Sequence, residues 1–193
     1  MRFLTSFILV CLILTAVASA RTVVIDAGHG GHDRGGIPGQ RLSEKAYALD
    51  LAKRLQRQLQ GAGYRAVMTR TRDVFVPLGT RVAIANRYRN AIFVSIHFNS
   101  AQRVGARGFE TFFYGSSSYR LAAQIQRNLL RTTRTENRGV KRRGFYVLRK
   151  TRIRAVLVEC GFLTNPIDGR LVRQSSYREK LAKAIADGIK AQY

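Results

Sequence analysis

Cysteine is almost absent from this chain of 193 residues, which contains only Cys11 and Cys160. Cys11 lies in an apolar N-terminal run that we expect to be removed, so one thiol remains. One thiol cannot form an internal disulfide, and it cannot build a structural zinc site, which usually needs several thiolates. The fold must therefore be held by packing, or by a metal bound through other side chains.

The chain also lacks low-complexity spacers, internal repeats and any long apolar run beyond its N-terminus. That terminus carries Arg2, an apolar run over residues 3–18, and then the small residues "ASA". The pattern predicts a cleaved signal peptide at residues 1–20, with an uncleaved membrane anchor as the alternative. We expect one exported domain at residues 21–193, periplasmic or secreted and associated with the cell wall.

Acidic residues are scarce: 11 of them face 34 lysines and arginines, giving a formal net charge of +23. Such a charge attracts polyanions, so the partner classes are nucleic acid and anionic polymers of the cell envelope. Residues 138–154 hold eight basic side chains around Phe145 and Tyr146, a composition that suits nucleic acid. A buried strand with solvated flanks explains it equally well. Because the predicted leader favours the envelope, we expect no specific nucleic-acid partner.

Strand-like and helix-like segments alternate along the rest of the chain. This succession predicts an α/β fold: a single domain with a central, mostly parallel β-sheet flanked by helices on both faces. The expected strands are at 23–25, 65–69, 91–96, 109–114, 145–148 and 155–158. The expected helices are at 43–59, 78–88, 121–129 and 176–189.

Four metal-binding or acid–base side chains lie where this fold would bring them together. His29 follows the first strand, His97 ends the third in "FVSIHFNS", and Glu159 ends "AVLVECGF". Glu44 starts the first helix, at the same edge of the sheet. Two histidines and one carboxylate, with the fourth position open, are a ligand set of catalytic zinc. We therefore predict one Zn²⁺ bound by His29, Glu44 and His97.

Glu159 is then left to act as general base and acid. A carboxylate beside the metal can take the proton of an attacking water and return it to a leaving amine. An ionised carboxylate that directly follows a wholly apolar run is costly without a cation nearby, so a purely structural role fits this residue poorly.

The glycines of "GHGGHDRGG" have a competing interpretation as a phosphate-binding loop. The segment matches neither G-x-G-x-x-G nor a P-loop, and no lysine stands where a P-loop needs one. We therefore expect the glycines to permit a sharp turn beside the metal. We expect His32 to face solvent or substrate, because neighbouring histidines in a turn usually point apart.

Several ordered blocks share a pattern with one enzyme family. They are "VVIDAGHGGHDRGG", "SEKAYALDLAKRL", "MTRTRDVFVPLGTRVAIANR", "FVSIHFNS", "GFETFFY", "NRGVKRRGFYVLRK" and "VLVECGFLTNP". Together they cover nearly the whole chain after the leader. In these blocks the sequence resembles the zinc-dependent N-acetylmuramoyl-L-alanine amidases of the amidase-3 type, which are cell-wall hydrolases. The resemblance implies cleavage of the amide between N-acetylmuramic acid and L-alanine in peptidoglycan.

The resemblance also implies roles for individual residues. Zinc ligands fall on His29, Glu44 and His97, and the catalytic glutamate falls on Glu159. Asn99 and Arg81 match recurring family positions, with either supporting and substrate-side roles or a role as buried scaffold. No long helical insertion separates the first two ligand positions, so we expect an open site, a monomer, and no control by an activator.

Two other functions stay open from the sequence. One is a different zinc amide hydrolase, such as a carboxypeptidase or an amidase of soluble muropeptides. The other is a cationic envelope-binding protein on a degenerate amidase scaffold.

Overall fold

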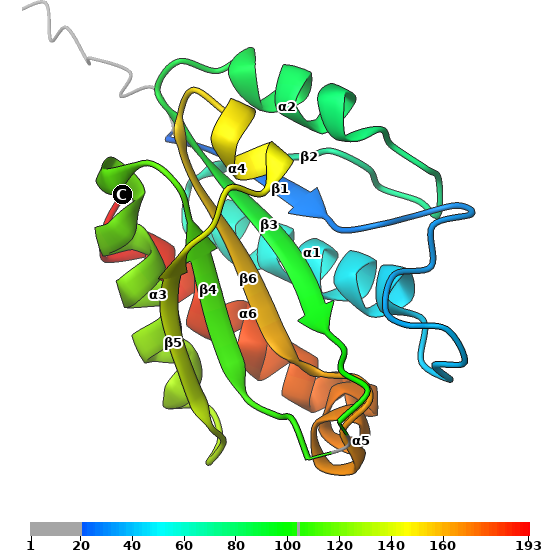
Figure 1. The fold of residues 1–193 in the computed structure, drawn as a ribbon. Coiled ribbons are helices and arrows are strands. Elements are labelled where there is room, and N and C mark those ends of the chain that lie inside the picture. The colour runs from blue at the N-terminus through cyan, green and yellow to red at the C-terminus, as the bar shows by residue number, and fades with distance from the viewer. Residues whose placement is uncertain (1–20, 104) are drawn as a thin grey trace, which may run out of the picture.

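The computed structural model describes residues 21–103 and 105–193; the predicted signal peptide lies outside these ranges. The described chain forms a six-stranded sheet in the order β2-β1-β3-β6-β4-β5, with helices on both faces (Figure 1). The strands are β1 (Thr22–Ala27), β2 (Arg65–Met68), β3 (Ala91–Asn99), β4 (Phe109–Phe113), β5 (Asn137–Arg142) and β6 (Arg154–Phe162). The helices are α1 (Glu44–Gly61), α2 (Leu78–Asn86), α3 (Tyr119–Leu130), α4 (Tyr146–Lys150), α5 (Pro166–Arg173) and α6 (Ser175–Lys190), with a 3₁₀ turn η1 (Ser116–Ser118).

The strand directions confirm the predicted, mostly parallel sheet. β2, β1, β3 and β6 run parallel, whereas β4 is antiparallel to β6 and β5 is parallel to β4. The ends of β1, β3 and β6 therefore share one edge of the sheet with the start of β4. This edge is where an α/β sheet places its functional groups.

One face of the sheet is fully covered by the long helices α1, α3 and α6 (Figure 1). Alternate strand residues point into this layer, among them Ile25, Val94 and Val158, each fully buried. The helices contribute apolar stripes of their own, including Leu51, Leu55, Leu121, Ile125, Leu181 and Ile185. This layer holds the larger hydrophobic core.

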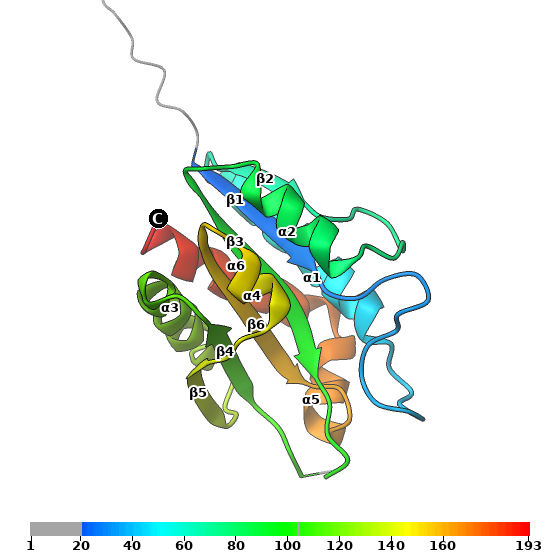
Figure 2. The same ribbon diagram turned by 45° about the horizontal axis from the view of Figure 1, so that its top comes forward.

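The other face is covered by the short helices α2 and α4, which lie over the start of β3 and β6 and not over their ends (Figure 2). Along each strand, the residues on this face change from apolar to polar where the two helices stop covering it. β3 presents buried Phe93, then Ser95, then His97, and β1 presents Val24, then Asp26. The apolar part of this sheet face lies under α2 and α4, and the polar part lies toward the functional edge.

The strand expected at residues 145–148 is wrong. Tyr146–Lys150 form helix α4, and Val147 and Leu148 are buried against the sheet. A short apolar run has no periodicity that separates a strand from a helical turn. The basic run of residues 138–154 consequently spans an edge strand and this short helix, instead of one buried strand. Within the described ranges, no helix is long and apolar enough to cross a membrane.

The close contact of α3 and α6 gives a test of core packing. A Cβ added at Gly188 would lie 2.8 Å from the Cα of Ile125. Changing Gly188 to Ala should lower the free energy of unfolding by about 1–3 kcal/mol, because the two helices must move apart. Gly61→Ala is the control, since its new Cβ would meet no atom within 4 Å. Urea denaturation of both variants measures the difference, and equal stabilities would contradict this packing.

Candidate metal centre and active site

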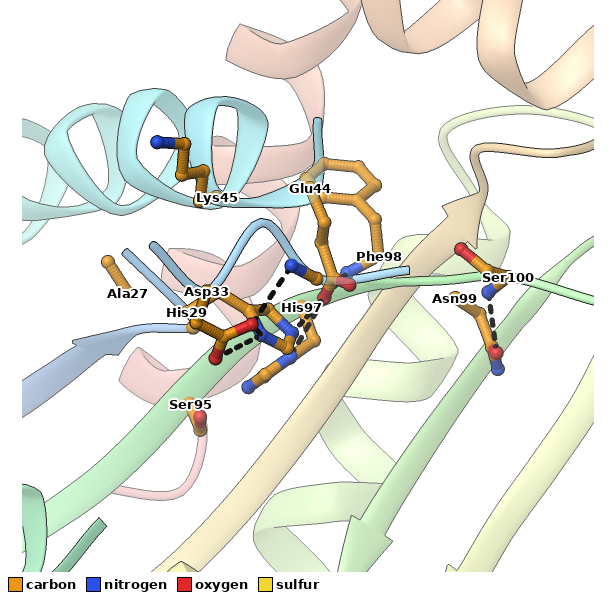
Figure 3. A network of polar contacts seen from close by, with 12 residues as sticks. Ala27, His29, Asp33, Glu44, Lys45, Ser95, His97, Phe98, Asn99 and Ser100 are labelled. Atoms are coloured by element: carbon orange, nitrogen blue, oxygen red, sulfur yellow. Dashed lines mark hydrogen bonds and ion pairs between the residues drawn. The ribbon is translucent and has the colours of Figure 1, made fainter. Parts of the chain in front are cut away.

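His29, Glu44 and His97 converge at the functional edge of the sheet, where their side chains point toward one another (Figure 3). Oε1 of Glu44 lies 3.1 Å from Nε2 of His29 and 2.8 Å from Nδ1 of His97. One potential ligand atom from each side chain falls within 4.8 Å of the other two. This group could bind a metal ion.

Three different elements deliver these side chains. His97 lies near the end of β3, and Glu44 occupies the first turn of α1, where side chains lean toward the start of the helix. His29 follows the end of β1 and has φ 57°, a left-handed conformation that is uncommon outside glycine. Such strain of about 1–3 kcal/mol is found at sites where surrounding structure enforces it.

The glycines of this turn allow close approach, as the sequence predicts. A Cβ at Gly28 would lie 2.4 Å from the ring of His97. A Cβ at Gly35, whose φ is 68°, would lie 2.5 Å from Oε2 of Glu44 and 2.7 Å from the ring of His29. Any side chain at these two positions would displace the groups that form the cluster.

Asp33 orients His29, and the sequence analysis missed it. Both carboxylate oxygens of Asp33 lie 2.9 Å from Nδ1 of His29, and the N–H of Gly35 donates to the same carboxylate. A proton held on Nδ1 would leave the Nε2 lone pair free for a metal ion bound beside Glu44. Burial alone would lower the pKa of His29, but hydrogen bonds and charge from Glu44 and Asp33 outweigh burial and raise it.

Glu44 is ionised over the whole neutral range. Burial would raise its pKa, but hydrogen bonds from the two histidines outweigh this effect and lower the pKa of Glu44 to about 2. The backbone N–H of Phe98 adds a further hydrogen bond of 3.0 Å to Oε1. A carboxylate held in its charged form between two imidazoles is suited to a cation.

Arg81 is part of the buried scaffold beneath His29. Its guanidinium donates to Oδ1 of Asp26 at 2.7 Å and to the carbonyl oxygen of His29 at 2.7 Å. Arg70 donates to the carbonyl oxygen of the preceding residue, Gly28, at 2.7 Å. The two arginines thus fix the strained turn, and Arg81 also lines the pocket.

Asp26 anchors Arg81 from the centre of the sheet. Its carboxylate also accepts hydrogen bonds from Thr69 and Ser95. Burial would raise the pKa of Asp26, but the charge of Arg81 and these hydrogen bonds hold it below its ordinary value. The ionised form therefore stabilises the fold above the pKa of an unfolded aspartate, and this contribution disappears as the pH falls through the lowered value.

Glu159 lies beside the cluster, opposite His97 in the register of β3 and β6. Of the 11 acidic residues, all within the described part of the chain, it alone has no hydrogen-bond or ion-pair partner there, and its Oε2 is buried. Burial, assisted by the charges of Glu44 and Glu110, raises the pKa of Glu159 well above its usual range. A carboxyl group in this state can carry a proton.

Asn99, at the end of β3, links this strand to β4 through polar contacts. Its Nδ2 donates to Oε1 of Glu110 at 2.5 Å, and its Oδ1 accepts from the N–H of Ser100. Glu110 lies opposite Glu159 across the antiparallel pair and is also bound by Lys141 at 2.5 Å. Asn99 therefore supports the carboxylate next to Glu159 and also lines the pocket.

A pocket of about 580 Å³ contains the cluster and Glu159. Most of the rest of its lining is apolar and comes from the approach to α2, from α4 and from β6. The exposed ring of His32 stacks on Phe75, which lines the pocket, with centroids 4.2 Å apart. His32 thus faces solvent beside the pocket. The pocket leaves the cluster open to a substrate.

Comparison of this chain with known proteins identifies its family. The model of a family described as N-acetylmuramoyl-L-alanine amidase matches residues 23–191. The chain belongs to this family. The family resemblance seen in the sequence motifs is thereby confirmed.

Individual relatives agree over most of this chain. It is 39% identical to the N-acetylmuramoyl-L-alanine amidase LytC of Bacillus subtilis over 176 residues, covering 89% of this chain but 35% of LytC. It is 40% identical to YqiI of the same organism, covering 90% of this chain and 85% of YqiI. The structure of the amidase AmiC2 of Nostoc punctiforme is 40% identical with a TM-score of 0.83, covering 89% of this chain and 96% of that one.

The role of Asp33 gives a first prediction for this site. Changing Asp33 to Asn should lower zinc affinity about 10- to 100-fold, because a neutral amide holds the Nδ1 proton of His29 less well. Competition with a chromophoric chelator measures the affinity. Asp187→Asn, an aspartate that pairs with Lys183 within α6, should leave it unchanged. Equal zinc affinity in the two variants would show that Asp33 does not tune the ligand.

The role of Arg81 gives a second prediction. Arg81→Met should reduce the free energy of unfolding by about 3–5 kcal/mol, because the charge of Asp26 remains buried without its partner. Arg120→Met, at an exposed position of α3, should have little effect. Denaturant unfolding at several pH values measures both variants. The deficit of the first should shrink at acidic pH, where Asp26 becomes protonated, and a deficit independent of pH would contradict the ion-pair explanation.

Proposed function

We propose that this protein is a zinc-dependent N-acetylmuramoyl-L-alanine amidase, which hydrolyses the amide between N-acetylmuramic acid and L-alanine in peptidoglycan. One observation carries the proposal: two imidazoles and one carboxylate converge on a common point in a pocket, with the unpaired carboxyl group of Glu159 beside them. Membership of the amidase family supports the substrate class.

The donor set fits one zinc ion. His29 would bind through Nε2, His97 through Nδ1, and Glu44 through its carboxylate, a combination with an open fourth position that is typical of catalytic zinc. When bound, the ion supplies Lewis acidity, which polarises the substrate carbonyl and makes water a nucleophile near neutral pH. Asp33 and the backbone N–H of Phe98 hold the ligands in position for it.

Glu159 supplies the proton transfers. As general base it accepts a proton from the water that attacks the amide carbon, and as general acid it delivers that proton to the departing nitrogen of L-alanine. The proton leaves with the amine, so the carboxylate returns to its starting state. A raised pKa supports this role, because a carboxyl group that is too acidic would hold the proton too weakly to pass it on.

The remaining features are compatible with work at the cell envelope. The predicted leader supports export to the periplasm or the cell wall, and the charge of +23 supports attraction to anionic wall polymers. The complete set of four site residues favours an active enzyme over a degenerate binding scaffold. Family membership favours an amidase over a carboxypeptidase.

Replacement of Glu159 separates metal binding from proton transfer. Glu159→Gln should lower kcat by at least about 100-fold while zinc content is retained, because the amide cannot take up the proton. Zinc content is measured by atomic emission, and turnover by release of peptides from purified peptidoglycan. Glu136→Gln is the matched control, since Glu136 is exposed and pairs with Arg138. Appreciable activity in the Glu159 variant would mean that another group is the base.

Removal of the metal tests the proposal as a whole. A chelator should abolish peptide release, and zinc should restore it. Protein that releases no free stem peptide from peptidoglycan in either state, while remaining folded, would rule out the proposed amidase activity.

A further inference from the structure

The pocket has an apolar end that the proposed chemistry does not use. Six large hydrophobic side chains are exposed on the described part of the chain, and four of them line this pocket. These four, which we call the apolar wall, are Phe75, Leu78, Phe145 and Tyr146, with exposed fractions of 45%, 54%, 42% and 41%. Exposed apolar side chains gathered in one place usually mark a binding site.

The wall is built from fixed elements. Phe75 and Leu78 flank the start of α2, and Phe145 and Tyr146 stand at the start of α4. Phe145 packs edge-on against the buried ring of Phe112, with centroids 5.1 Å apart. Phe75 stacks on His32, with ring centroids 4.2 Å apart and ring planes tilted by 33°. The aromatic faces are therefore held in place before any ligand arrives.

The charges in the pocket are the reverse of those on the chain as a whole. Beside the two histidines, the charged residues of its lining are four carboxylates and one guanidinium. The guanidinium belongs to Arg81, which is buried and paired with Asp26 at 2.7 Å. A protein of net charge +23 thus offers no unpaired cation in the pocket lining. Apart from the proposed metal ion, an anionic ligand has no unpaired cationic side chain to bind in the pocket lining, whereas an uncharged ligand needs none.

The apolar wall and the carboxylates of the pocket suit one part of the proposed substrate, the glycan, better than the other part, the stem peptide. The stem peptide carries carboxylates, whereas the glycan at an amidated muramoyl residue is uncharged. The C–H groups on one face of a pyranose ring can lie against an aromatic face, which carries partial negative charge. The sugar hydroxyl groups can donate hydrogen bonds to pocket carboxylates such as Asp33, whereas these carboxylates repel the carboxylates of the peptide.

We propose that the apolar wall binds the sugar on the acyl side of the scissile amide. The stem peptide then leaves the pocket toward basic side chains outside it. The assignment rests on the proposed amidase function and adds a direction to the substrate. It makes Tyr146 and Phe75 determinants of glycan recognition.

Binding without turnover tests this directly. Zinc-loaded protein is titrated by calorimetry with chitotetraose, an uncharged glycan probe, and with N-acetyl-L-alanyl-D-isoglutamine, an anionic peptide probe. Tyr146→Leu and Phe75→Leu should each weaken chitotetraose binding about tenfold and leave peptide binding unchanged. Tyr119→Leu removes an equally exposed aromatic ring that lies outside the pocket, on α3, and should change neither. Absence of chitotetraose binding, or selective loss of peptide binding, would overturn the proposal.

Turnover gives an independent readout. The two substrates are N-acetylmuramoyl-L-alanyl-D-isoglutamine and its analogue with D-lactoyl in place of the muramoyl group, which has the same amide but no sugar. Tyr146→Leu should lower kcat/KM about tenfold for the first and leave the second unchanged, and equal losses for both would contradict a sugar-binding wall. If the native enzyme cleaves neither substrate, the amidase function fails, while the calorimetric result still decides what the wall binds.

Discussion

Helices α2 and α4 are too short to cover the face of the sheet on which they pack, and the site depends on this limit. Under the helices, β1 and β3 present Val24 and Phe93 to a small core. Beyond them the same strand face presents Asp26, Ser95 and His97, whose polar groups need charged or hydrogen-bonding partners. Arg81 meets the first of these needs, and in doing so holds the carbonyl group of His29. Partial cover thus produces both the pocket and the rigid support of its ligands.

The fold class follows from the sequence, and so does the meeting of four predicted side chains at one edge of the sheet, because both depend on local patterns. Buried strands are readable as apolar runs, and His97 and Glu159 stand at the ends of two of them. Asp33 was not predicted, because its bond to His29 depends on a left-handed turn that no periodicity signals. Arg70 was missed for a related reason. An arginine in a polar loop looks solvated until tertiary structure brings the carbonyl of Gly28 to it. The strand expected at 145–148 failed because two apolar residues fit either a strand or one helical turn.

The chain uses almost all of its acidic residues to position other groups. Ten of them pair with basic side chains or with the histidines of the site, and most of the 34 basic side chains have no acidic partner among the described residues. The exception, Glu159, has its Oε2 buried beside the candidate metal-binding cluster, where desolvation raises its pKa. A strongly basic protein can therefore keep a pocket lined with carboxylates, because the excess of positive charge lies on its outside.

Both outermost strands of the sheet, β2 and β5, leave one backbone edge without a neighbouring strand. Such edges can recruit a strand of another molecule and start aggregation. Here β5 has the sequence "NRGVKR", with three cations and a glycine in left-handed conformation at Gly139, and β2 begins with exposed Arg65. Edge-to-edge pairing of two copies would bring these cations together, and neither Arg142 nor Arg65 has an acidic partner among the described residues to compensate. The basic composition consequently protects the sheet against self-association at high local concentration.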